Sequence, residues 1–274
     1  MLDKLIQYFS TIPSLDRALI LAGGITFFWL AESAIPLFHF NYNKWKHAGI
    51  NIFFTFTTII VNFAFALLIV YTSKWCIEHH FGVLQFIKMP LWLTLLTGVM
   101  LLDLIGAYFI HLIQHKVPWM WKFHMIHHAD TCVDTTTANR HHPGESIFRA
   151  VFTTLAVFIA GAPVWLVMLY QSLSVVLSQF NHANIRMPEW LDKPLRFVIV
   201  TPNMHRVHHH FMQPETDSNY SNIFSLWDRV FGTYRYKPPE QLKYGLDILG
   251  DKNCNDLGEQ LNLPFSKYPK QAGK

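Results

Sequence analysis

Residues 91–128 read LWLTLLTGVMLLDLIGAYFIHLIQHKVPWMWKFHMIHH. The first part, Leu91–Ile113, is an apolar run interrupted by Asp103, and a membrane-spanning helix needs about 20 apolar residues. The remainder is rich in histidine, which is a common metal ligand. An apolar helix that ends in a dense group of imidazoles predicts a metal site at the edge of a lipid bilayer.

Three further apolar stretches flank this segment: Ala18–Phe38, Ile50–Tyr71 and Ile147–Phe180. The first is too long for the apolar part of a signal peptide, so we expect it to be retained as a membrane helix. The last contains Gly161-Ala162-Pro163, so it is either two helices or a span and a half-helix that meet at Pro163. The sequence therefore predicts an all-α integral membrane protein with about four transmembrane helices.

The composition also indicates a lipid environment. Hydrophobic residues make up 51% of the 274 residues and charged residues only 15%, whereas a soluble domain carries about 25% charged residues. The net charge of +4 is small for a nucleic-acid-binding surface and is typical of basic residues that flank membrane spans. We therefore expect the partners to be a membrane and a lipid, and no nucleic acid.

The distribution of charge predicts the orientation and the domain organisation. Basic residues lie on the predicted membrane side that carries the histidines, at Lys44, Lys46, Lys116 and Lys122. Cytoplasmic loops are enriched in such residues, so this side is predicted to face the cytoplasm. We expect one membrane domain over residues 1–274, in which the polar residues 237–274 form a small cap or a loose tail.

Histidine, and not cysteine, is the candidate metal ligand. Twelve of the sixteen histidines fall between His111 and His210. The three cysteines, Cys76, Cys132 and Cys254, are scattered without Cys-x-x-Cys spacing, so neither a disulfide framework nor a thiolate site is expected. The clustered histidines form one HxxxH and two HxxHH motifs: His111 and His115; His124, His127 and His128; His205, His208 and His209.

The spacing of these motifs fits a site for two metal ions. Residues three or four apart lie on one face of a helix, so we expect the three rings of each HxxHH motif to point into the same sector. A single catalytic metal takes about three protein ligands, whereas eight imidazoles suit two metals with positions left open. Neutral nitrogen donors favour Fe²⁺ over hard ions such as Mg²⁺ or Ca²⁺.

Further polar residues fit the same site. His182, at the end of the fourth apolar stretch, is either a ninth ligand or a polar helix end. Asp103 lies eight residues before His111 on nearly the same helix face. It is either a carboxylate that holds the second N–H of a ligating imidazole or a backbone-bonded core acid. His142 is a less secure ligand. The other histidines are expected to be bystanders or ordinary polar residues: His39, His47, His79, His80, His141 and His210.

These motifs, in this order, resemble the fatty acid hydroxylase and sterol desaturase superfamily over about residues 95–235. The superfamily pattern is HxxxH, HxxHH and a later HxxHH, and neighbouring segments match as well: Trp121-Lys-Phe-His124, Arg140–Glu145, His182-Ala-Asn184, Thr201–His205, Asn219-Tyr220 and Trp227–Thr233. Two positions depart from the pattern. Leu112 stands where Arg is frequent, and Ser221 where Gly is usual.

The resemblance implies a cap of short helices over four membrane helices, with two Fe²⁺ ions at the cytosolic interface. It also implies O₂ as co-substrate, an external electron donor, and hydroxylation or desaturation of an unactivated C–H bond in a fatty acyl, sterol or related lipid. The implied metal ligands are His111, His115, His124, His127, His128, His182, His205, His208 and His209. Weaker candidates around them are Asp103, His142 and Asn184.

Two other functions are alternatives for a membrane protein with these histidine motifs. A zinc-dependent membrane hydrolase needs a water-activating carboxylate beside its ligands, as in HExxH, and the histidine motifs contain none. A metal transporter or chaperone would place its ligands across the bilayer midplane, whereas these motifs lie at helix ends and in polar links. Both comparisons favour the oxygenase.

Overall fold

The computed structural model describes residues 2–249 and 255–267, and these contain helices and no β-strand. Cys254 and parts of the predicted C-terminal tail lie outside the described residues. Within the described part, five helical segments are long and apolar enough to cross a membrane: Ser14–Ala34, Lys44–Phe86, Leu91–Lys116, Pro143–Ala160 and Val164–His182.

These five segments consist of α2 (Ser14–Ala34), α3 (Lys44–Glu78) with α4 (Val83–Phe86), α5 (Leu91–Asp103) with η1 (Leu104–Phe109) and α6 (Ile110–Lys116), α8 (Pro143–Ala160), and α9 (Val164–His182). The shorter elements are α1 (Leu2–Ser10), α7 (Pro118–His128), η2 (Thr135–Asn139), α10 (Glu189–Val198), α11 (Pro202–His208), α12 (Leu226–Val230), η3 (Pro239–Gln241), α13 (Leu257–Asn262) and η4 (Leu263–Phe265).

The number of candidate spans is five and not about four, because the fourth apolar stretch contains two helices. Gly161 ends α8 in a left-handed conformation with φ 66°, and Pro163 caps the start of α9. A left-handed glycine ends a helix readily, and proline cannot continue one but suits the start of the next. Of the two divisions that the sequence left open, two full helices is the observed one.

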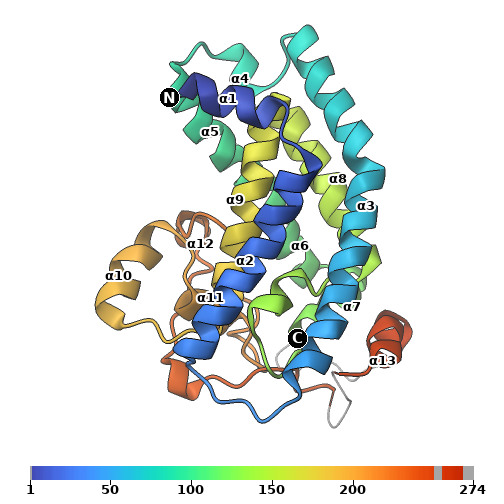
Figure 1. The fold of residues 1–274 in the computed structure, drawn as a ribbon, viewed down its shortest axis with the longest axis vertical. Helices are drawn as coiled ribbons and strands as arrows, with labels where there is room; N and C mark the ends of the chain where they lie inside the picture. Colours follow the sequence, from blue (N-terminus) through green and yellow to red (C-terminus); the bar gives the residue numbers. More distant parts are fainter. Residues whose placement is uncertain (1, 250–254, 268–274) are drawn as a thin grey trace.

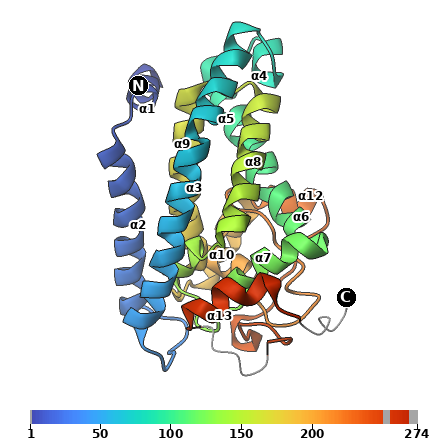
Figure 2. The ribbon, with the colours of Figure 1, turned by 90° about the vertical axis from the view of Figure 1, so that its right-hand side faces the viewer.

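The long helices stand side by side, and a cap of short helices closes one end of the bundle (Figures 1 and 2). α3 packs along α8, α2 packs along α9, and α5 contacts both α8 and α9. The outer faces are apolar: Phe63 and Leu67 on α3 are each 81% exposed. Exposed apolar surface of this extent is typical of helices that face lipid.

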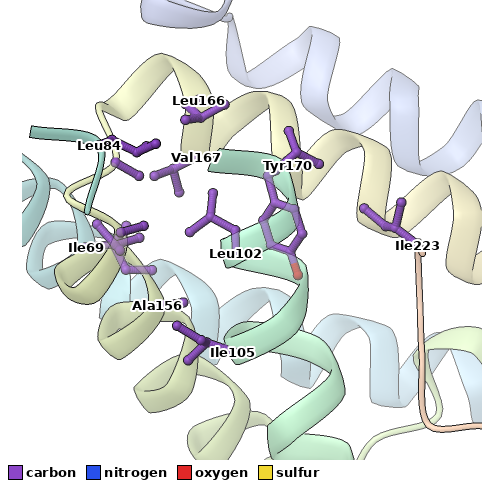
Figure 3. Close-up of a cluster of buried hydrophobic side chains, with 13 residues drawn as sticks. Ile69, Leu84, Leu102, Ile105, Ala156, Leu166, Val167, Tyr170 and Ile223 are labelled. Carbon is purple, nitrogen blue, oxygen red and sulfur yellow. The ribbon is translucent and has the colours of Figure 1, made fainter. Parts of the chain in front are cut away.

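The membrane-side core forms where α3, α5, α8 and α9 meet (Figure 3). Leu102 and Leu166 are completely buried there, and the ring of Tyr170 packs against the same cluster. Burial of each such side chain contributes about 1.5–3 kcal/mol. This core fixes the path of the Leu91–Lys116 span, which carries the first histidine motif.

A π-helical segment interrupts that span directly before the first histidine motif. Residues Leu104–Phe109 form η1, and α6 follows with His111 and His115. A π-turn adds a residue to a helical turn, which rotates the helix that follows it, and such turns are frequent at functional sites. The rotation sets the face on which α6 presents its imidazoles.

A second core joins the cap to the start of α3. Phe54 on α3 packs with Met125 and Ile126 on α7 and with Leu246 and Leu263 of the C-terminal region. All five side chains are buried. Leu246 and Leu263, in the described part of residues 237–274, therefore pack against the cap.

The loop between α8 and α9 contacts the loop between α3 and α4 through Gly161 and Phe81, and this contact gives a test of the fold. Gly161 has a positive φ, and a Cβ there would collide with the carbonyl oxygen of Phe81. We expect Gly161→Ala to lower the free energy of unfolding by about 2 kcal/mol, because the left-handed conformation alone costs about 1–2 kcal/mol. Denaturant titration of the purified protein in detergent micelles measures this change.

The matched control is Gly23→Ala in α2, where an added methyl group meets nothing within 4 Å. Alanine in a helix is about 1 kcal/mol more favourable than glycine, so this variant should be at least as stable as the parent protein. Equal stability of the two variants would contradict the packing described for Gly161.

Candidate metal centre

The nine histidines expected at the site lie in two buried groups at the capped end of the bundle. Within each group, one ring nitrogen from every histidine lies within 4.8 Å of the corresponding nitrogens of the others. The five-histidine cluster consists of His111, His115, His124, His128 and His208. The four-histidine cluster consists of His127, His182, His205 and His209. Both clusters are capable of binding metal ions.

Each HxxHH motif divides between the two clusters instead of pointing into one sector. On α7, His124 and His128 face the five-histidine cluster and His127 faces the other. The second motif divides in the opposite way, with His205 and His209 in the four-histidine cluster. Residues four apart share a helix face more closely than residues three apart. The clusters are adjacent, with the rings of His128 and His209 stacked 4.8 Å apart.

In the five-histidine cluster, the hydrogen-bond partners of His111 and His124 show which nitrogen of each of these two rings carries hydrogen. His111 Nδ1 lies 2.8 Å from the carbonyl oxygen of Tyr220, and His124 Nδ1 lies 2.8 Å from Glu145 Oε1. These oxygens accept hydrogen bonds, so both Nδ1 atoms carry hydrogen and each neutral ring has a lone pair on Nε2. The two Nε2 atoms face each other at 3.1 Å. A cation bound between them would convert this repulsion into coordination.

His182 has the same arrangement at the centre of the four-histidine cluster. Its Nδ1 donates to the carbonyl oxygen of Ser178 at 2.7 Å. Its Nε2 therefore presents a lone pair, and it lies 3.0–3.2 Å from the Nε2 atoms of the three other members: His127, His205 and His209. The sequence left His182 open as a ninth ligand or a polar helix end. A ring on which three other imidazoles converge does not fit the second of these.

The surroundings keep the imidazoles in the neutral form that binds metals. Burial, reinforced by neighbouring imidazoles, lowers the pKa well below its ordinary value for the histidines carried by the cap: His127, His128, His205, His208 and His209. An imidazole must be deprotonated before it can coordinate a metal. The donor set and its environment thus fit transition-metal ions.

A single segment, residues 217–220, orients three rings of the five-histidine cluster. The carbonyl oxygens of Ser218 and Tyr220 accept from His208 Nδ1 at 2.7 Å and from His111 Nδ1 at 2.8 Å. Asp217 Oδ1 lies 3.1 Å from Nδ1 of the third ring, that of His115. Metal-binding histidines usually donate their second N–H to a carboxylate or a carbonyl oxygen, and this segment supplies both.

Asp103 does not hold a histidine, contrary to the first of its two expected roles. Its carboxylate accepts from the backbone N–H groups of Ile223 and Phe224 and from Trp227 Nε1. Eight residues of helix separate Asp103 from His111 by about 12 Å, which is beyond hydrogen-bond reach. Its contribution is indirect, because it fixes the segment that follows Tyr220.

His142 and Asn184 also lie outside the two clusters. His142 Nδ1 accepts from the N–H of Gly144 and caps the start of α8. Asn184 binds both backbone groups of Phe38. A side chain that can cap or bridge backbone groups is not distinguishable in sequence from one near a metal. The side chains of both residues therefore hold backbone groups of the protein and do not contact the clusters through these bonds.

Two histidines expected to be bystanders or ordinary polar residues have buried carboxylate partners. The ring of His141 lies 5.2 Å from that of His127, and its Nε2 is 3.7 Å from Glu145. His47 Nε2 lies 2.8 Å from Asp130. Neither histidine is spaced three or four residues from a histidine motif. The sequence therefore contained no sign of these contacts, which depend on the fold. Burial raises the pKa of the Asp130 carboxyl, but His47 and Arg140 beside it outweigh this effect and hold the pKa below its ordinary range.

Glu145 supplies a carboxylate beside the clusters, which the histidine motifs alone did not indicate. It is completely buried, and Oε1 binds His124 Nδ1 and, at 2.9 Å, Arg149 Nε. The histidine motifs predicted no carboxylate beside the ligands, and this prediction is wrong for the folded chain. The observed contacts are those of a group that positions His124.

A cavity of about 260 Å³ opens beside the clusters and touches histidines of both. His111 lines it from the five-histidine cluster, and His127, His182 and His205 line it from the four-histidine cluster. A molecule in this cavity can therefore approach both groups at once.

Comparison with known proteins adds the family. Residues 95–233 match the Fatty acid hydroxylase family. Ornithine lipid hydroxylase OlsE of Rhizobium tropici is 26% identical over 59% of this chain and 47% of its own length. Human alkylglycerol monooxygenase is 30% identical over 52% of this chain and 30% of its length. Cholesterol 25-hydroxylase of Rattus norvegicus is 24% identical over 59% of this chain and 52% of its length.

This chain spans between less than a third and about half of the length of these relatives. No solved structure matches it. The family match covers about half of the 274 residues and includes all nine histidines of the two clusters, and the chain therefore belongs to the Fatty acid hydroxylase family.

Proposed function

We propose that this protein is a multi-pass membrane hydroxylase that oxidises an unactivated C–H bond of a lipid with O₂. Two buried imidazole clusters that share one cavity are the observation that carries the proposal. Family membership and the five apolar helices support it. The names of the relatives quoted above describe hydroxylases and monooxygenases of lipids, which favours hydroxylation over desaturation.

The nine cluster histidines would hold two iron ions, one in each cluster. Iron bound there would supply the activation of O₂ needed to oxidise a C–H bond. Insertion of one oxygen atom consumes two electrons and two protons and releases water, so the proposal includes an external electron donor. With the basic residues on the capped side, we infer that the cap faces the cytoplasm and meets this donor there.

The chain's own residues hold the rings and limit access of water. Glu145 and the carbonyl oxygens of residues 218 and 220 fix the rings through Nδ1, which leaves Nε2 for the metals. All nine rings are buried, and exclusion of water protects reactive species from side reactions. The cavity beside the rings places the lipid carbon.

Metal content distinguishes this function from its rivals. We expect the purified protein to contain about two iron ions per chain and to consume O₂ only with a reductant and a lipid present. Removal of iron by a chelator should abolish O₂ uptake, and added Fe²⁺ should restore it. One zinc ion per chain without O₂ uptake would instead support a zinc hydrolase, and metal binding without any turnover would support a transport protein.

Substitution of a central ring tests the clusters directly. His182→Ala removes the imidazole on which three others converge, so we expect loss of at least one iron ion per chain and of hydroxylase activity by more than about a hundredfold. His39→Ala is the matched control, because His39 is exposed and belongs to neither cluster. Equal iron content in the two variants, measured by elemental analysis, would refute the assignment of His182.

Glu145→Gln tests the orientation of a ring without removing it. The variant keeps the size of the side chain but weakens the acceptor for His124 Nδ1, so we expect iron affinity to fall about 10–100-fold. Competition with a chelator of known affinity measures the change. Glu240→Gln, at an exposed position, serves as control. Unchanged affinity in Glu145→Gln would show that this carboxylate does not support the site.

A further inference from the structure

Half of the wall of the cavity beside the clusters is polar, although the cavity lies among helices that are long and apolar enough to cross a membrane. Much of the wall comes from α3, α8 and α9, beside residues of η1, α6, α7, η2, α11 and the segment 220–222. Polar side chains that line it from α3, α8 and α9 include Thr58, Asn62, Ser146, Arg149, Thr153, Gln171 and Ser174. Polar and charged groups inside membrane-spanning helices are rare and mark paths for substrates or ions. A cavity for hydrocarbon alone would have apolar walls throughout.

Some of these polar groups are satisfied by the protein itself. The hydroxyls of Thr58 and Ser146 lie 2.9 Å apart and bind each other. Thr153 donates to the carbonyl oxygen of Arg149 at 2.9 Å. Ser174 accepts from Asn222 at 2.8 Å. These groups make the walls polar without requiring a ligand.

Asn62, Gln171 and Arg149 also line the cavity, but part or all of their hydrogen-bonding capacity is unused within the described residues. Neither Asn62 nor Gln171 forms a side-chain hydrogen bond with any part of the chain that the structure describes. Arg149 binds Glu145 through Nε, and its two terminal nitrogens make no further hydrogen bond to residues 2–249 or 255–267. The three side chains come from α3, α9 and α8, and all line the same cavity.

Hydrocarbon in this cavity would leave amide and guanidinium groups without partners, which is unfavourable away from water. Hydroxyl, carbonyl or carboxylate oxygens would satisfy them. The volume of about 260 Å³ is below the usual 300–1,000 Å³ of pockets that hold whole small molecules. The cavity therefore accommodates the oxygen-rich part of a lipid together with the first carbons attached to it, and the rest of the hydrocarbon remains outside.

We propose that this cavity binds the polar head region of an amphipathic lipid, so that the oxidised carbon lies within a few bonds of the head group. The inference rests on the proposed lipid hydroxylase function and narrows its substrate class. Gln171 and Asn62 bind hydroxyl or carbonyl groups of the head region, and the terminal nitrogens of Arg149 donate to an oxygen atom. The histidines at the cavity wall then face the first carbons after the head group.

Binding without turnover tests the head-group site. The full-length, iron-loaded protein is held in detergent micelles without O₂, and the affinities of radiolabelled monohexadecylglycerol and hexadecane are measured. The test variants are Gln171→Leu and Asn62→Leu, which replace an amide with an apolar group of similar size and do not touch a histidine. We expect each to weaken binding of monohexadecylglycerol roughly three- to tenfold, the effect of losing one hydrogen bond, and to leave hexadecane unchanged.

The controls come from neighbouring positions that do not line the cavity. Ser172→Ala follows Gln171 on α9, and Phe63→Leu follows Asn62 on the lipid-facing side of α3. Both should bind the two lipids as the parent protein does. Iron content equal to that of the parent protein establishes that the test variants are folded. Undiminished binding of monohexadecylglycerol by folded Gln171→Leu and Asn62→Leu would overturn the head-group site.

The position of the product hydroxyl gives an independent measure. Tandem mass spectrometry of lipids from cells with and without the protein should locate the new hydroxyl within a few carbons of a head group. A hydroxyl far along the hydrocarbon chain would overturn this inference and leave the hydroxylase function intact. Absence of any oxidised lipid would count against the proposed function itself, and the binding measurements would then decide the head-group site alone.

Discussion

The structure depends on a close approach of imidazole nitrogens that is unfavourable by itself. His111 and His124 each commit Nδ1 to an oxygen acceptor, so their Nε2 lone pairs face each other at 3.1 Å. Protonation would relieve the repulsion, but the site is completely buried and charged imidazolium is disfavoured there. A metal ion satisfies both lone pairs at once. The free energy of binding such an ion would then help to hold the cap against the membrane helices.

The cap maintains this approach through a segment that contains no cluster histidine. Tyr220 supplies the carbonyl oxygen for His111, and the two oxygens of Asp228 accept from the N–H groups of Tyr220 and Ser221. Asp103, inside a membrane span, holds the residues that follow. Two buried carboxylates thus fix the backbone whose carbonyl oxygen orients the ring. The orientation of the cluster is set from the membrane side as well as from the cap.

The sequence was sufficient for the helices and the ligand candidates and insufficient for the contacts between segments. Apolar length and histidine spacing identified the apolar stretches and eight of the nine rings, because both are local properties. His182, a lone histidine, was left open between a ligand and a polar helix end. The division of each HxxHH motif between two clusters depends on how α7 and α11 face each other. The roles of Asp103, His141 and Glu145 depend on residues far away in the chain. Leu263 is buried in the cap, although its segment has no periodic pattern.

Where α3, α8 and α9 approach the clusters, the same helices have an apolar outer surface and polar residues at the cavity. The outer surface must be apolar to face lipid, and Phe63 satisfies this demand. One position before it, Asn62 lines the cavity, although an amide in a membrane span is unfavourable unless it has a partner. Asn62 is exposed on α3, and the hydrocarbon of a membrane offers its amide no hydrogen bond. A polar group of the proposed lipid substrate would supply that partner, and the same contact would also set which carbon reaches the histidines.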